Sequence, residues 1–201
     1  MQRRRACLAL ALSLPAAAVR AQPVVDVAGV KFPTTLTLGG STLMLNGAGI
    51  RYRAIFKVYA AGLYLQARAS TPEAVLAAAG PKRIHMVLMR TIDAAEFGKI
   101  LSAGIEKNAS REEFIQSLPA IARMGEAASQ HKQLVAGDTL SIEWVPGTGT
   151  TLLVKGKPEV GPYKDAGFFN AMAKIWLGPN PADAQLKDAL LGIQRSAPIL
   201  N

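Results

Sequence analysis

Apolar and polar residues alternate along the first third of the chain, which is the period of strands with one buried face. Residues 34–38 and 42–46 are two such runs joined by a pair of glycines, and this arrangement predicts a hairpin. Residues 50–66 are rich in aromatic and β-branched side chains and contain no proline, so they predict one long strand. Residues 82–90 and a hairpin over 139–155 are further predicted strands.

A helical period replaces this alternation in the middle of the chain. Asp93 with Glu96, and Ser110 with Glu113, are spaced as capping pairs, and apolar residues recur after each pair at intervals of three and four. Both segments are therefore predicted helices, and Pro119 is expected to kink or split the second.

Three more helices are predicted from their end signals. A short one opens at residues 71–73, residues 165–177 form another that Gly178 closes, and Asn180-Pro181 begins the last. The predicted elements run in the order strands, helices, a hairpin and helices. This is not the strict alternation of strand and helix that a parallel sheet needs. The sequence predicts an α+β fold in which a large antiparallel sheet is covered on one face by a layer of helices.

The N-terminus has the pattern of a secretory signal peptide. Arg3, Arg4 and Arg5 precede an apolar run over residues 6–19, and Ala21 supplies a small residue at the cleavage position. We expect residues 1–21 to be removed, leaving residues 22–201 as a single domain in the periplasm or outside the cell. Without the four arginines of this segment, the formal net charge falls from +9 to +5.

Composition and motifs narrow the function further. The mature chain has no basic block, which argues against nucleic acid, and no apolar run long enough to stay inserted in a membrane. Residues 47–52 lack the third glycine of a dinucleotide loop, and the two histidines, His85 and His131, lack metal-pair spacing. We expect neither a cofactor nor a metal.

Cations gather at one end of the long predicted strand. Strict alternation places Arg51, Arg53, Lys57 and Tyr59 on the same side. If helices cover that side, at least one guanidinium needs an anionic or hydrogen-bonding partner, because a buried unpaired charge is costly. A solvated edge of the sheet is the alternative, and the pattern alone leaves both open.

These segments resemble the chalcone isomerase-like family, particularly its bacterial exported branch. The resemblance rests on residues 47–51 (GAGIR), similar to the family's glycine-arginine turn, and residues 56–65 (FKVYAAGLYL), similar to its central strand. Residues 137–138, 146–150, 156–157 and 168–178 add support further along the chain. The resemblance implies an open-faced β-sandwich, in which a large antiparallel sheet and a helical layer enclose a ligand cleft.

The resemblance also implies roles for particular residues. Arg51 occupies the place of the arginine that binds and polarises the ligand in the plant enzymes, whereas Tyr59 replaces a threonine. The family's catalytic tyrosine aligns with Phe97, which has no hydroxyl, and its asparagine falls near Gly104 or Asn108. The resemblance thus favours a retained pocket with altered chemistry.

Three functions remain open at this point. The first is binding of a fatty acid or other apolar carboxylate, with Arg51 and Tyr59 on the head group and Phe97, Ile100, Leu101 and Phe168 around the tail. The second is an isomerase, an intramolecular lyase acting on a conjugated ketone through Arg51 and Tyr59, so whether the protein is an enzyme stays undecided. The third is a non-catalytic interaction module. Neither the ligand nor the oligomeric state follows from the sequence.

The group facing Arg51 is expected to separate these functions. A second hydrogen-bond donor there favours a carboxylate or oxyanion, whereas an acidic neighbour indicates a structural ion pair. Glu106, Glu143 and Glu159 are the candidates for such an acid.

Overall fold

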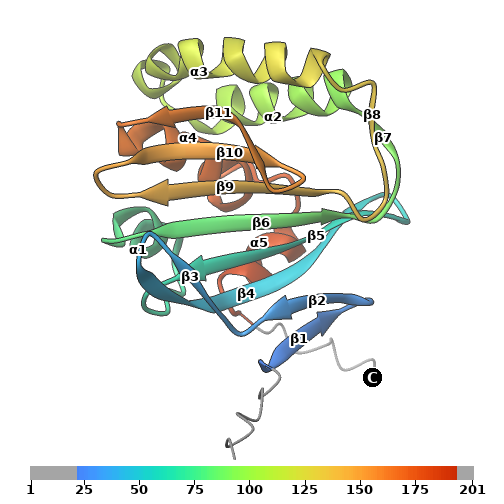
Figure 1. Cartoon of the computed structure of the whole chain (residues 1–201), viewed down its shortest axis with the longest axis vertical. Coiled ribbons are helices and arrows are strands. Elements are labelled where there is room, and N and C mark those ends of the chain that lie inside the picture. Colours follow the sequence, from blue (N-terminus) through green and yellow to red (C-terminus); the bar gives the residue numbers. More distant parts are fainter. Residues whose placement is uncertain (1–21, 194–201) are drawn as a thin grey trace, which may run out of the picture.

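A seven-stranded antiparallel sheet dominates the computed structural model, which describes residues 22–193 (Figure 1). Its strand order is β11-β10-β9-β6-β5-β4-β3. These strands are β3 (Thr35–Leu38), β4 (Ser41–Arg53), β5 (Phe56–Leu65), β6 (Lys82–Leu88), β9 (Thr139–Val145), β10 (Gly149–Val154) and β11 (Lys157–Tyr163). Two small sheets pair β1 (Val24–Val27) with β2 (Val30–Pro33), and β7 (Ile92–Asp93) with β8 (Gln133–Leu134).

The helices gather on one face of the large sheet. They are α1 (Pro72–Ala77), α2 (Ala94–Asn108), α3 (Arg111–Ser129), α4 (Ala166–Leu177) and α5 (Ala184–Leu190). In Figure 1, α4 and α5 lie behind the sheet, whereas α2 and α3 form a pair beyond the β11 edge. Helix α4 packs on β9 and β10, α5 on β4 and β5, and α2 and α3 both pack on α4. None of the helices in residues 22–193 is both long and apolar enough to cross a bilayer.

The core is divided by the sheet into two unequal parts. The larger part lies between the sheet and the helices and includes the fully buried Trp176, Phe169 and Ile84. A smaller cluster around Phe32 and Tyr64 lies on the other face, where β1 and β2 cover part of the sheet.

The predicted α+β fold, with a helical layer on an antiparallel sheet, is confirmed. The predicted signal peptide, residues 1–21, lies outside the described residues.

The single long strand predicted over residues 50–66 is wrong. The chain turns at Ala54 and Ile55, so β4 and β5 form a hairpin in which Arg53 pairs with Phe56. Ala54 takes the left-handed conformation, at a φ of 51°, without the glycine or asparagine that usually marks such a turn. Because the chain reverses there, Arg51 lies directly across from Tyr59.

The glycines before Arg51 form no turn, contrary to the resemblance to a glycine-arginine turn. Gly47 and Gly49 lie inside β4, on the face that receives α5. A Cβ on Gly49 would stand 2.6 Å from the Cβ of Ala189, and one on Gly47 would collide with the Ala189 carbonyl oxygen. The missing side chains therefore let α5 approach the sheet closely.

The helix ends agree with the predicted signals except at the start of the last helix. Asp93 and Ser110 cap α2 and α3 as predicted, and the Ser110–Glu113 capping box is complete. Pro119 does not split α3, whose two halves are held by packing on α2 and α4. The last helix begins at Ala184 with Asp183 as its N-cap, and not at Asn180-Pro181. Strand β11, which contains two prolines, had no predicted counterpart.

Candidate functional site

A half-open cleft of about 300 Å³ lies between the β4–β5 hairpin, the β6–β7 connection and helix α2. Its inner wall is apolar and its rim is charged. The apolar wall consists of Val58, Ile92, Phe97, Ile100, Leu101, Ile175 and Ala182. The rim consists of Arg51, Arg53, Arg90, Asp93 and Glu96, and Tyr59 stands between the two parts. Five of the residues predicted to contact ligand, Arg51, Tyr59, Phe97, Ile100 and Leu101, therefore line one cavity.

Arg51 is held beside the cleft by the N-terminus of α5. Its Nη1 lies 3.6 Å from Asp183 Oδ2, and its side chain is one-quarter exposed. This separation is too long for a direct hydrogen bond. The Asp183 carboxylate already accepts the backbone N–H groups of Tyr52, Gln185 and Leu186, at 2.8–3.2 Å. Asp183 thus orients Arg51 electrostatically, while its oxygens accept hydrogen bonds from backbone N–H groups.

Asp183 is the acidic neighbour of Arg51 that the sequence did not identify. Glu143 instead pairs with Arg83, Glu159 with His131, and Glu106 lines a groove between α2 and α3. In the sequence, Asp183 is only a carboxylate two residues after Asn180-Pro181, near the start of the last predicted helix. Its position next to Arg51 follows from how α5 docks on β4, for which the chain carries no local signal.

Tyr59 supplies a second donor directly across the hairpin from Arg51. Its ring is 5% exposed, and its hydroxyl oxygen accepts a hydrogen bond of 2.8 Å from Trp176 Nε1. Burial raises the pKa of Tyr59 to about 12, against the opposing effects of Trp176 and Arg51. The phenol therefore stays protonated, and among the described residues its O–H proton has no hydrogen-bond acceptor. Tyr59 lines the cleft, and this proton is not committed to another described group.

Phe97 and Leu101 separate the cleft from a smaller cavity behind them. That inner cavity, about 30 Å³, is lined mainly by apolar groups of α2, α3 and the sheet, including Met124, Leu140 and Leu152. Phe97 and Leu101 line both cavities. The Phe97 ring meets the Tyr59 ring edge to face, with centroids 6.3 Å apart. Phe97 thus closes the bottom of the cleft.

The other two predicted ligand-binding residues lie elsewhere. Asn108 is buried at the end of α2, where it donates to the carbonyls of Gly104 and Asn180 and accepts from the Asn180 N–H. Its amide ties α2 to the chain leading into α5. Phe168 lies two helical turns before the cleft-lining Ile175 on α4 and packs against Tyr163, with ring centroids 5.3 Å apart. The structure brings neither residue to the cleft.

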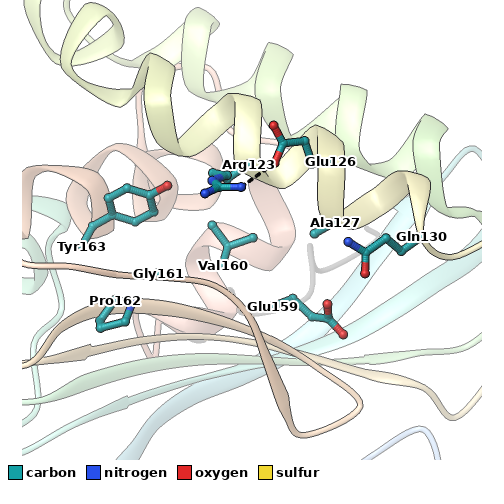
Figure 2. Close-up of a pocket in the computed structure, with 9 residues that line it drawn as sticks. All are labelled: Arg123, Glu126, Ala127, Gln130, Glu159, Val160, Gly161, Pro162 and Tyr163. Carbon is teal, nitrogen blue, oxygen red and sulfur yellow. Dashed lines mark hydrogen bonds and ion pairs between the residues drawn. The ribbon is translucent and has the colours of Figure 1, made fainter.

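A second cavity of about 360 Å³ lies between α3 and β11 (Figure 2). Arg123 and Glu126, which pair on its upper wall, have side chains more than 60% exposed. Glu159 and Gln130 add further polar groups, and Val160 and Ala127 supply little apolar surface. Because ligand pockets combine a mainly apolar wall with a few converging polar groups, the smaller cleft at Arg51 is the better candidate.

Charge at the cleft is close to balanced. Three arginines line it together with Asp93, the N-cap of α2, and Glu96, and Asp183 stands beside Arg51. In the part of the chain that the structure describes, His, Cys, Asp and Glu form no cluster of three suited to a metal ion. The cleft therefore offers directed hydrogen-bond donors at one end and apolar surface at the other.

Comparison with known proteins places this fold in a family. The model of the chalcone isomerase-like family matches residues 24–192, so the chain belongs to that family. A fatty-acid binding protein of Arabidopsis thaliana has a similar solved structure, with a TM-score of 0.65 and 14% sequence identity. The match covers 84% of this chain and 96% of that one. No curated protein matches the sequence significantly.

Proposed function

We propose that this protein binds a small amphipathic carboxylate of the fatty-acid type in the cleft between the β4–β5 hairpin and α2. The observation that carries this proposal is the pair of donors where the rim of the cleft meets its apolar wall. Arg51 and Tyr59 are cross-strand neighbours, and the Tyr59 phenol keeps its proton. A guanidinium and a neutral phenol together satisfy two oxygens of one carboxylate.

The acidic neighbour does not remove Arg51 from this role. Asp183 stands 3.6 Å from the guanidinium and is already bonded by three backbone N–H groups. It therefore leaves the Arg51 N–H groups able to bond a ligand oxygen. Its charge lowers the attraction for an anion, so we expect Arg51 to set the orientation of the head group more than the total affinity.

The apolar wall suits a short acyl chain. The cleft volume of about 300 Å³ lies at the lower end of the roughly 300–1,000 Å³ of small-molecule sites. Eight methylene groups fully buried contribute about 6 kcal/mol at roughly 0.8 kcal/mol each, before the cost of ordering the ligand. Phe97, Ile100 and Ile175 form the surface for this tail. The fatty-acid binding function of the Arabidopsis neighbour supports the same choice of ligand.

Native mass spectrometry of the purified protein, followed by solvent extraction, tests whether an acyl compound co-purifies. The head-group role is tested by titrating decanoate and decanol. We expect the protein to prefer decanoate, and Arg51→Ala to weaken decanoate binding by about 10- to 100-fold, the range for a hydrogen bond to a charged group. Lys57→Ala is the matched control, since it removes a cation from the adjacent strand outside the cleft lining. An unchanged preference for decanoate in Arg51→Ala contradicts the proposal.

The same two donors support isomerisation of a conjugated ketone as a second candidate. A neutral phenol beside a guanidinium can stabilise an enolate oxygen, and holding the reacting groups together contributes the rest. The family resemblance aligns Phe97 with the catalytic tyrosine of the plant enzymes, which makes this the weaker candidate. Turnover of a chalcone above the uncatalysed rate, lost in Tyr59→Phe, would favour it over binding alone.

We further propose that the protein acts in the periplasm after cleavage of residues 1–21. The support is the arginine cluster and apolar run at the N-terminus. The intact mass of the exported protein tests this, because cleavage after Ala21 predicts Gln22 as the first residue.

A further inference from the structure

The tip of the β4–β5 hairpin is the most exposed apolar feature among the described residues. Ile55 is 84% exposed and Phe56 is 57% exposed. Neither side chain belongs to the two core clusters, so the fold does not need them to be apolar. Single exposed apolar residues are common on soluble proteins. Ile55 and Phe56, however, are adjacent and stand together at the end of a hairpin.

Basic residues surround the end of this hairpin. Arg53 and Lys57 flank the two apolar residues on the hairpin, and the guanidinium of Arg90 lies 5.3 Å from the centre of the Phe56 ring. We use "hairpin tip" for these five residues. No aspartate or glutamate occurs between Asp26 and Glu73, or between Lys82 and Ile92. The carboxylates that share a surface with the tip are Asp93 and Glu96, on the cleft side of Arg53 and Arg90.

We propose that the hairpin tip docks on the surface of an anionic lipid bilayer. Ile55 and Phe56 would enter the boundary between head groups and acyl chains, while Arg53, Lys57 and Arg90 meet the lipid phosphates. An apolar tip surrounded by cations matches such an interface, where aromatic side chains are favoured and each basic group is attracted by the surface charge. Two side chains are too little surface for a stable protein partner, which needs about 800 Å² on each side.

The hairpin tip borders the cleft, so docking on a bilayer would bring the cleft close to the lipid. Arg53 and Arg90 belong both to the hairpin tip and to the cleft rim. Ile100, which is 45% exposed, continues the apolar surface from the cleft wall outward on α2. A bilayer at the tip therefore faces the cleft mouth, and an acyl chain can pass between the two with a short path through water. This last step rests on the proposed function; the docking itself does not.

Sedimentation with vesicles tests the docking. Protein expressed from the full sequence is mixed with vesicles of phosphatidylcholine, with or without phosphatidylglycerol. We expect binding to the anionic vesicles that weakens as salt is raised, and a loss of at least about tenfold in Ile55→Ser/Phe56→Ser. Arg53→Gln/Lys57→Gln should lose binding to the anionic vesicles selectively.

The matched control is Ile115→Ser/Leu118→Ser, which removes two apolar side chains of α3 that are 54% and 45% exposed. It should bind as the parent protein does. Phe56→Trp adds a direct reading, since brominated lipids should quench a tryptophan at that position. Equal binding to both vesicle types, equal loss in the α3 variant, or absence of quenching would overturn the proposal.

Two further measurements separate docking on lipid from self-association and from the proposed ligand binding. A change in oligomeric mass on Ile55→Ser/Phe56→Ser would show that the tip contacts another copy of the chain, and would overturn docking on lipid. Titration with decanoate in solution should give the same affinity for this variant and the parent, because neither side chain lines the cleft. If decanoate fails to bind the parent, the proposed function falls while the vesicle result still stands.

Discussion

The hydrogen bond between Trp176 and Tyr59 links the cleft to the core, and its removal is expected to have a measurable cost. Trp176 is fully buried, and its indole N–H can only donate. Tyr59→Phe leaves this donor without an acceptor while changing little of the packing. An unsatisfied buried polar group costs about 1–3 kcal/mol, which corresponds to a fall in Tm of roughly 2–12 °C for a chain of this size.

A double-mutant cycle isolates that bond from the loss of packing. Trp176→Phe removes the donor but also creates a cavity, so its free energy of unfolding falls for two reasons. In Tyr59→Phe/Trp176→Phe no unpaired donor remains. We therefore expect the double variant to be more stable than the sum of the single changes predicts, by about 1–2 kcal/mol.

Urea unfolding of the four proteins, followed by circular dichroism, measures the coupling. Tyr52→Phe serves as the control, because the Tyr52 hydroxyl is only half-buried and makes no hydrogen bond to a described residue; it should change stability by less than about 0.5 kcal/mol. A coupling energy within about 0.3 kcal/mol of zero would refute the assignment of Trp176 as the donor that holds Tyr59.

Three further predictions concern pH, packing and ligand length. Burial, followed by the charge of Arg83, lowers the pKa of His85 from 6.5 to about 4, so the unfolded chain binds the proton more readily; stability should fall by roughly 2 kcal/mol as pH drops from 7 to 4.5, and urea unfolding of His85→Asn should show a flatter profile. Gly49→Ala should lower the free energy of unfolding by about 1–3 kcal/mol, because the new Cβ meets Ala189 at 2.6 Å; a neutral result in thermal unfolding would contradict this close approach. Phe97→Ala should join the cleft to the inner cavity and shift the affinity series toward longer fatty acids, as calorimetry would show; the same shift in Ile100→Ala would argue against Phe97 as the barrier.

Local signals accounted for most of the secondary structure. The caps at Asp93 and Ser110 were predictable because a side chain three residues from its partner bonds the backbone within one helical turn. The hairpin at Gly39-Gly40 was predictable for a similarly local reason. The turn at Ala54 was missed, because alanine there adopts a conformation that its own side chain does not favour.

The site was predictable only in part. Family resemblance pointed to Arg51, and apolar spacing placed Phe97 and Leu101 on one face of α2, which agrees with their position in the cleft. The same reasoning included Phe168 and Asn108, which face other parts of the molecule. Spacing along one helix tells which residues share its face, but not which neighbouring element that face will meet.

By itself, the sequence determined most of the strands and helices, though not the turn at Ala54 or strand β11, and it placed cations near one end of a predicted strand. Only the tertiary structure decided that Tyr59 faces Arg51, that Trp176 donates to Tyr59, and that Asp183 stands behind the guanidinium. Residues 59 and 176 are separated by 117 positions, and no local pattern links them. Such pairs arise because the hairpin reverses the chain and because Gly47 and Gly49 let α5 dock on the sheet, and both depend on packing between elements distant in sequence.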